Sequence, residues 1–99
     1  LPQDSAKALE LFHRAGELGN TESYHNIGCS YKHGEGVERD VEKAKHYWEL
    51  AAIRGEVDAR YNLADLEEDA GNMDKALKHY MIAAGCGDDD SLKRIREFY

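Results

Sequence analysis

The chain has 99 residues, enough for one domain with a continuous but thin hydrophobic core. With 41% hydrophobic and 33% charged residues, its composition suits a soluble, elongated helical protein with much exposed surface. A net charge of −7 without a cluster of lysines or arginines argues against nucleic-acid binding, and no apolar run approaches the roughly 20 residues that span a bilayer.

Six helices joined by short turns are predicted along the chain. The only proline is Pro2, and the alternation of Val, Ile or Thr that is typical of strands does not occur. In chain order, the expected helices cover residues of about 4–18, 21–33, 40–54, 57–70, 72–85 and 89–98. The sequence therefore predicts an all-α protein.

Polar residues mark the beginnings of these helices. Asp4, Asn20, Asp40 and Asn72 are the expected N-caps of the first, second, third and fifth helices. The carboxylates of the Asp88–Asp90 run favour the N-terminus of the sixth helix. The run lacks the further ligands of a calcium loop, so capping explains it sufficiently.

Apolar and small residues at helical spacing predict the inward face of each helix. In chain order, the expected inward residues are Ala8, Leu11, Phe12 and Ala15; Tyr24, Ile27, Gly28 and Tyr31; Ala44, Tyr47, Trp48, Ala51 and Ala52; Ala59, Leu63 and Leu66; Ala76, Leu77, Tyr80, Ala83 and Ala84; and Leu92, Ile95 and Phe98. We expect the aromatic rings to fill gaps between helices, with ligand stacking by Trp48 as the alternative.

A fixed internal period is the dominant pattern. Five residues of the first helix and its end return 36 positions later, and part of the set returns after a further 32 positions. The set is Asp4, Lys7, Ala8, Ala15 and Gly19, then Asp40, Lys43, Ala44, Ala51 and Gly55, then Lys75, Ala76, Ala83 and Gly87. Such a period is typical of stacked repeat arrays, which usually hold other molecules rather than perform reactions.

The recurring motifs resemble a known family. They are Gly-x-Gly-Val-x-x-Asp from Gly34 to Asp40, Gly-x-x-x-Ala-x-Tyr-Asn-Leu-Ala from Gly55 to Ala64, and Lys-Ala-x-x-x-Tyr-x-x-Ala-Ala-x-x-Gly from Lys75 to Gly87. Together they resemble the Sel-one-like repeat (SLR), a relative of the tetratricopeptide repeat (TPR), over essentially the whole chain. The resemblance implies an α/α solenoid, a right-handed superhelix of about six antiparallel helices, as a single repeat domain over residues 1–99.

One turn departs from the SLR pattern. The tight Ala70-Gly71-Asn72 replaces the Gly-x-Gly-Val turn, which gives the 32-residue step and a TPR-like spacing between two helices. SLR proteins with paired cysteines carry them at the second Ala of the Ala-Ala pair, among other places. These positions are Gly16, Ala52 and Ala84 in this chain, so that disulfide pattern is missing.

The resemblance implies a partner-binding surface. In SLR and TPR arrays the first helix of each hairpin lines a concave face that usually holds extended peptides. The matching positions are His25, Asn26, Cys29, His33, Tyr61, Asn62, Asp65, Asp69, Lys93, Arg94 and Glu97. Asn26 and Asn62 recur one period apart, and an amide can satisfy both groups of a peptide backbone. Alternatively, these asparagines connect neighbouring helices.

The fourth predicted helix is rich in carboxylates. An acidic stripe would favour a basic ligand, whereas a solvated helix face is the simpler interpretation. Its members are Asp58, Asp65, Glu67, Glu68 and Asp69. The carboxylate clamp of some TPR proteins needs several basic groups on this face, and only Lys93 and Arg94 are present.

Metal binding, cofactors and catalysis are not expected. His25, Cys29 and His33 follow at i, i+4 and i+8, but such a stripe drifts by about 40° per step, so three ligands do not easily converge on one ion. Cys29 with His25 is the only adjacent nucleophile–base pair, and nothing in the sequence marks a pocket around it.

Cys29 and Cys86 are expected to be buried or half-buried thiols on helices too far apart for a disulfide. Two such thiols slightly favour a reducing compartment, and the localisation is otherwise unknown from the sequence.

The expected function is a protein–protein interaction module or scaffold. The alternative is a structural or self-assembling segment of a larger SLR protein, with end-to-end contacts through Ile95, Phe98 and Tyr99. Stable arrays carry polar capping repeats, which this chain lacks, so we expect a fragment of a longer array.

Overall fold

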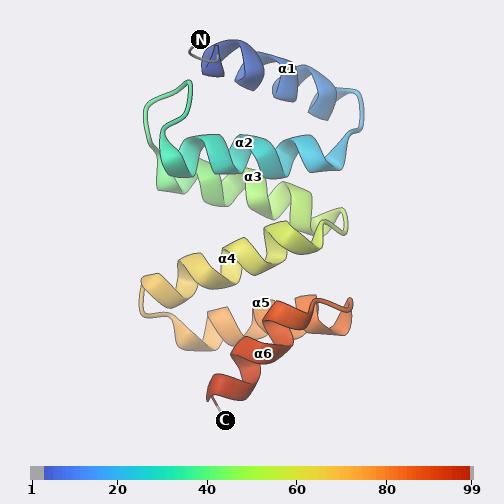
Figure 1. Ribbon diagram of the computed structural model, residues 1–99, viewed down its shortest axis with the longest axis vertical. Helices are drawn as coiled ribbons and strands as arrows, with labels where there is room; N and C mark the ends of the chain where they lie inside the picture. Colours follow the sequence, from blue (N-terminus) through green and yellow to red (C-terminus); the bar gives the residue numbers. More distant parts are fainter. Residues whose placement is uncertain (1–3, 99) are drawn as a thin grey trace. The chain divides into compact units, whose positions relative to one another are not determined.

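The computed structural model describes residues 4–98, in which six α-helices and no strand occur (Figure 1). The helices are α1 (Ser5–Glu17), α2 (Thr21–His33), α3 (Val41–Ile53), α4 (Val57–Asp69), α5 (Met73–Gly85) and α6 (Asp89–Phe98). Their bounds differ from the predicted ranges by at most one residue at either end. The all-α prediction is confirmed. The prediction about Tyr99 lies outside the described residues.

The chain divides into two compact units between Glu56 and Val57. The first unit contains α1, α2 and α3, and the second contains α4, α5 and α6. In each unit, successive helices pack against each other along the chain. The single repeat domain over residues 1–99 stays a prediction.

Four of the five predicted caps form a side-chain hydrogen bond. The carboxylates of Asp4 and Asp40 and the amide oxygen of Asn20 accept from the backbone N–H three residues ahead, at 2.9, 3.1 and 3.1 Å. Asp88, the residue before α6, accepts from the Ser91 N–H at 3.0 Å. Asn72 occupies the N-cap position of α5 without this bond.

Trp48 is the centre of the core of the first unit. Its indole is 3% exposed and donates a hydrogen bond of 3.1 Å to the backbone oxygen of His25 on α2. Gly28 lies directly beneath the ring, since a Cβ atom there would be 2.4 Å from Trp48. The ring therefore packs against the bare backbone of α2.

Tyr80 has the corresponding place in the second unit. It is fully buried and forms a cluster with Ala64 and Ala76, against which Ile95 and Phe98 of α6 are partly buried. The Tyr80 hydroxyl donates a hydrogen bond of 2.9 Å to Glu68 Oε1.

Two predicted inward positions are wrong. Leu11 is 49% exposed, because α1 packs mainly on α2 through a narrower stripe that contains Leu9 and Gly16. Leu92 is 40% exposed, because Ser91, bonded to Asp88, is the residue of α6 that faces inward there.

The cysteine prediction is partly wrong. Both thiols are free and Cys29 is half-buried, as expected. Cys86 is exposed instead, because it follows the last helical residue of α5, beyond the buried stripe that ends at Ala83. Within residues 4–98, no helix is long and apolar enough to cross a membrane.

Candidate functional site

The predicted partner-contacting residues lie on α2, α4 and α6, with different degrees of exposure. Six of the side chains are half-buried: His25, Asn26, Cys29, Tyr61, Asn62 and Arg94. The other five are exposed: His33, Asp65, Asp69, Lys93 and Glu97. The first unit holds four of the eleven, and the second unit holds seven.

A thiol and an imidazole meet on α2. Cys29 Sγ lies 3.8 Å from His25 Nε2, as the spacing of one helical turn predicts. The backbone of His25 is held by the indole of Trp48. Among residues 4–98, no three His, Cys, Asp or Glu side chains gather closely enough to bind a metal ion.

An aromatic stack flanks this helix in the first unit. The ring of Tyr47 on α3 is stacked on Tyr31 and Tyr24 of α2, with centroid distances of 5.8 and 6.3 Å. Arg54 lies 4.9 Å from the centre of Tyr24, and Lys43 lies 5.5 Å from that of Tyr31. Burial, with smaller effects of the neighbouring phenols, raises the pKa of Tyr47. Sequence reasoning found the rings but missed their two cations, which helix spacing alone does not reveal.

Arg94 is bonded within the second unit. Its guanidinium forms an ion pair with Glu68 Oε2 of α4 and a second contact of 3.2 Å with Glu97 Oε2 of α6. It also lies 5.9 and 5.4 Å from the ring centres of Tyr80 and Phe98. The hydrogen bond from Arg94 lowers the pKa of Glu68, and the same bond raises the pKa of Arg94.

The acidic stripe of α4 is not one solvated face. Asp58, Asp65 and Asp69 are exposed, but Glu67 is only 5% exposed and accepts a hydrogen bond of 3.0 Å from the Asn72 amide. Glu68 pairs with Arg94. The interpretation of the whole stripe as solvated is therefore wrong, because both glutamates have structural partners.

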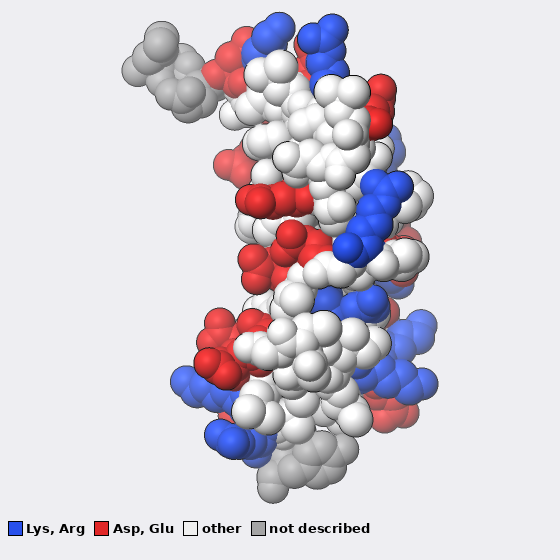
Figure 2. All heavy atoms as spheres, turned by 90° about the vertical axis from the view of Figure 1, so that its right-hand side faces the viewer, with Lys and Arg blue, Asp and Glu red and all other residues white. Residues whose placement is uncertain are grey.

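Tyr61 lies beside carboxylates in the second unit. Its ring contacts Tyr80 edge-on at 5.5 Å. Burial raises the pKa of Tyr61, and the charges of Asp65 and Asp90 raise it further. Figure 2 shows that on one side of the molecule acidic and basic side chains are interspersed with uncharged surface in each unit.

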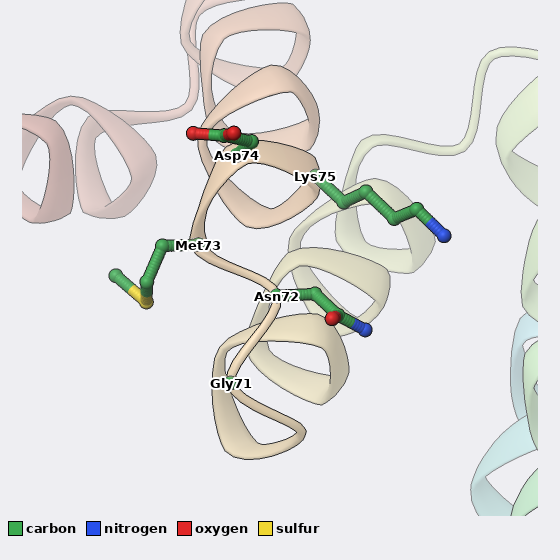
Figure 3. Close-up of a pocket in the computed structure, with 5 residues that line it drawn as sticks. All are labelled: Gly71, Asn72, Met73, Asp74 and Lys75. Carbon is green, nitrogen blue, oxygen red and sulfur yellow. The ribbon is translucent and has the colours of Figure 1, made fainter.

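Two open hollows lie at turns. One, of about 410 Å³, is lined by Gly71 and Asn72 of the α4–α5 turn and by Met73, Asp74 and Lys75 at the start of α5; the Met73 and Asp74 side chains point to one side and those of Asn72 and Lys75 to the other (Figure 3). The other, of about 290 Å³, is lined by Arg14, Glu17 and Leu18. Neither lining set brings together a nucleophile, a base and an orienting group.

Comparisons with solved structures agree with this architecture. A Sel1 repeat protein from Oxalobacter formigenes is 29% identical, with a TM-score of 0.87, over 100% of this chain and 42% of its own. A protective antigen, c5321, of uropathogenic Escherichia coli displays an SLR fold; it is 22% identical, with a TM-score of 0.79, over 89% of this chain and 20% of its own. The chain thus spans less than half the length of either protein.

The sequence model of the Sel1 repeat matches residues 1–20, 21–56 and 57–88. The second and third matches each contain one helical hairpin, α2–α3 and α4–α5, as the repeat motifs predict. The resemblance found in the motifs is thereby confirmed, and the fold is an all-α solenoid of this type. The chain belongs to the Sel1 repeat family.

Proposed function

We propose that this chain is a non-catalytic interaction module in which α2 of the first unit, and α4 and α6 of the second unit, each present contact residues to a peptide or protein partner. Sel1 repeat proteins are generally protein–protein interaction modules, which supports the broad role. The observation that carries this proposal is that repeat-equivalent positions on α2 and α4 present partly exposed polar side chains. Asn26 and Asn62 are the clearest pair.

The mechanism needs binding geometry and no chemistry. Each amide can donate to a carbonyl and accept from an N–H of an extended peptide backbone. The Trp48 indole bonds to the backbone of α2, and the Tyr80 hydroxyl bonds to Glu68 of α4. Each helix that carries an asparagine is therefore fixed within its own unit without a partner. A preformed surface of this kind lowers the ordering cost of binding.

A selection experiment tests this role. A displayed peptide library is selected on the chain, and the affinity of the enriched peptides is measured for wild type and for Asn26→Ala/Asn62→Ala. The matched control is Glu49→Ala/Lys78→Ala, since both residues are exposed on the second helices of the hairpins. We expect at least tenfold weaker binding for the asparagine variant alone, with an unchanged circular dichroism spectrum. Equal binding by all three proteins would contradict the proposed surface.

Self-assembly is the second candidate, favoured by exposed apolar side chains. Leu18 is 89% exposed, Ile53 78% and Met81 62%. Analytical ultracentrifugation over a range of concentrations would detect association, and Met81→Glu should reduce it. Phe98→Glu is a poorer probe, because Phe98 packs against the Tyr80 cluster. A monomer at all concentrations would remove this candidate.

A further inference from the structure

Helix α6 is the most weakly buried helix of the second unit. Ser91 is its one residue with less than a tenth of its surface exposed, and its larger apolar residues, Leu92, Ile95 and Phe98, all remain partly exposed. Apolar burial alone therefore holds α6 less firmly than it holds the α4–α5 hairpin.

One ion pair connects α6 to the far helix of that hairpin. The Arg94 side chain extends across the ring of Tyr80 on α5 and reaches Glu68 on α4. Glu68 also accepts the hydroxyl hydrogen bond of Tyr80, so one carboxylate joins side chains from all three helices. The Arg94 and Glu68 side chains are 28% and 24% exposed, so water and ions reach the pair.

We propose that α6 opens and closes on the α4–α5 hairpin as a separate element, and that the Arg94–Glu68 ion pair controls this equilibrium. Opening separates Arg94 from Glu68 and exposes the ring of Tyr80, while the Tyr80–Glu68 hydrogen bond holds α4 and α5 together. This inference goes beyond the proposed interaction role, because it assigns a conformational switch to the second unit that operates without a partner.

The switch bears directly on the predicted contact residues. Lys93, Arg94 and Glu97 all lie on α6, whereas Tyr61 and Asp65 lie on α4. A closed α6 places both sets on the same unit in a fixed arrangement, and an open α6 does not. A ligand that binds only the closed form would shift the equilibrium toward it.

Hydrogen exchange of backbone amides tests the proposal, with Arg94→Met and Arg96→Met as matched variants. Both remove one positive charge from α6, but Arg96 is exposed and methionine at 94 keeps an apolar stem over Tyr80 and Phe98. We expect Arg94→Met to speed exchange of the α6 amides by about five- to tenfold, with α4 and α5 amides changed less than about twofold. Arg96→Met should leave all three helices within about twofold of wild type.

Ionic strength gives a second readout. Sodium chloride at about 1 M should speed α6 exchange in wild type by screening the partly exposed pair, and should have little effect in Arg94→Met. Equal acceleration by both arginine variants would show a general charge effect and overturn the proposal. So would parallel acceleration of α4, α5 and α6, because the second unit would then open as a whole. Failure of the peptide selection would leave these exchange results unaffected, so the two ideas fail separately.

Discussion

The hairpins α2–α3 and α4–α5 fill the space between their two helices with different pairs of residues. Trp48 and Tyr80 hold the same repeat position, four residues after the buried Ala44 and Ala76. The larger indole packs on Gly28, whereas the smaller phenol packs on Ala64, the repeat equivalent of that glycine. The repeat thus fixes the combined volume of the two positions rather than the identity of either residue.

The polar groups of these two rings have different hydrogen-bond partners. The indole N–H of Trp48 donates to a backbone oxygen, so it fixes only the neighbouring helix. The hydroxyl of Tyr80 donates to the carboxylate of Glu68, which also binds Arg94. The same position therefore bonds to the backbone of a predicted contact residue, His25, in the first hairpin, and is linked through Glu68 to the side chain of another, Arg94, in the second.

The turns of the two hairpins differ as well. In the first, the backbone at Gly36 approaches α1 so closely that a Cβ atom would lie 2.3 Å from the backbone of Ser5, and its φ of +76° also favours glycine. In the second, the short turn at Gly71 leaves an open hollow. The longer turn thus connects its hairpin to α1 of the first unit.

Trp48→Ala should have the largest effect on the stability of the first hairpin. Removing a nearly fully buried indole leaves a cavity and removes the hydrogen bond from the indole to the His25 carbonyl, so we expect a loss of about 3–5 kcal/mol in unfolding free energy. Urea unfolding followed by circular dichroism measures it. Glu49→Ala, exposed on the same helix, should change the free energy by less than about 0.5 kcal/mol. A loss below about 1 kcal/mol for Trp48→Ala would show that the indole is not the core of this hairpin.

Gly28→Ala should reveal the volume match between the two hairpins. The added methyl overlaps the Trp48 ring, and overpacking of this kind costs about 1–3 kcal/mol, although alanine favours the helix by about 1 kcal/mol. Adding Trp48→Tyr recreates the pair of the second hairpin. We expect the double variant to be more stable than additivity predicts by about 1–2 kcal/mol, measured as a double-mutant cycle. Additive effects would mean that the two positions are not packed against each other.

Sequence reasoning reached the helices and the repeat but not the long-range side-chain pairs. Periodicity and caps are local, so Asp40 and Trp48 could be assigned from nearby residues. The pairing of Glu68 with Arg94 links positions far apart in the chain and depends on how α6 lies on α5, which no local pattern encodes. For the same reason the sequence alone predicts one acidic face on α4, although Glu67 and Glu68 have structural partners. The contact residues themselves stay predictions.

Exchanging the two N-cap residues should separate two roles that the sequence does not distinguish. Asp40 caps α3 through its carboxylate, so Asp40→Asn should cost only a few tenths of a kcal/mol. Asn72 donates to the buried Glu67 instead, so Asn72→Asp removes a donor and adds a like charge. We expect a loss of about 1 kcal/mol for Asn72→Asp, measured by urea unfolding. Equal effects of the two variants would show that both residues act as simple caps.

The Tyr80 hydroxyl should give the second hairpin a pH dependence that Trp48 cannot give the first. Burial, with a smaller contribution from Glu68, raises the pKa of Tyr80 from 10.0 to about 12. The unfolded chain therefore loses this proton at a lower pH than the folded chain. The contribution of Tyr80 to the unfolding free energy is complete below a pH of about 10 and falls as the pH rises toward about 12. Tyr47 and Tyr61 also lower the unfolding free energy as the pH rises, since their pKa values are raised as well.

Tyr80→Phe isolates the Tyr80 contribution by difference. At pH 7 the variant loses the hydrogen bond to Glu68 and should be less stable by about 1 kcal/mol. Because phenylalanine cannot ionise, its unfolding free energy should fall less steeply than that of wild type between pH 9 and pH of about 12. The two curves should therefore converge at alkaline pH, which urea midpoints at several pH values would measure. Parallel curves would show that Tyr80 ionises equally in the folded and unfolded chains, and the role of Glu68 as its hydrogen-bond acceptor in the folded chain would then be wrong.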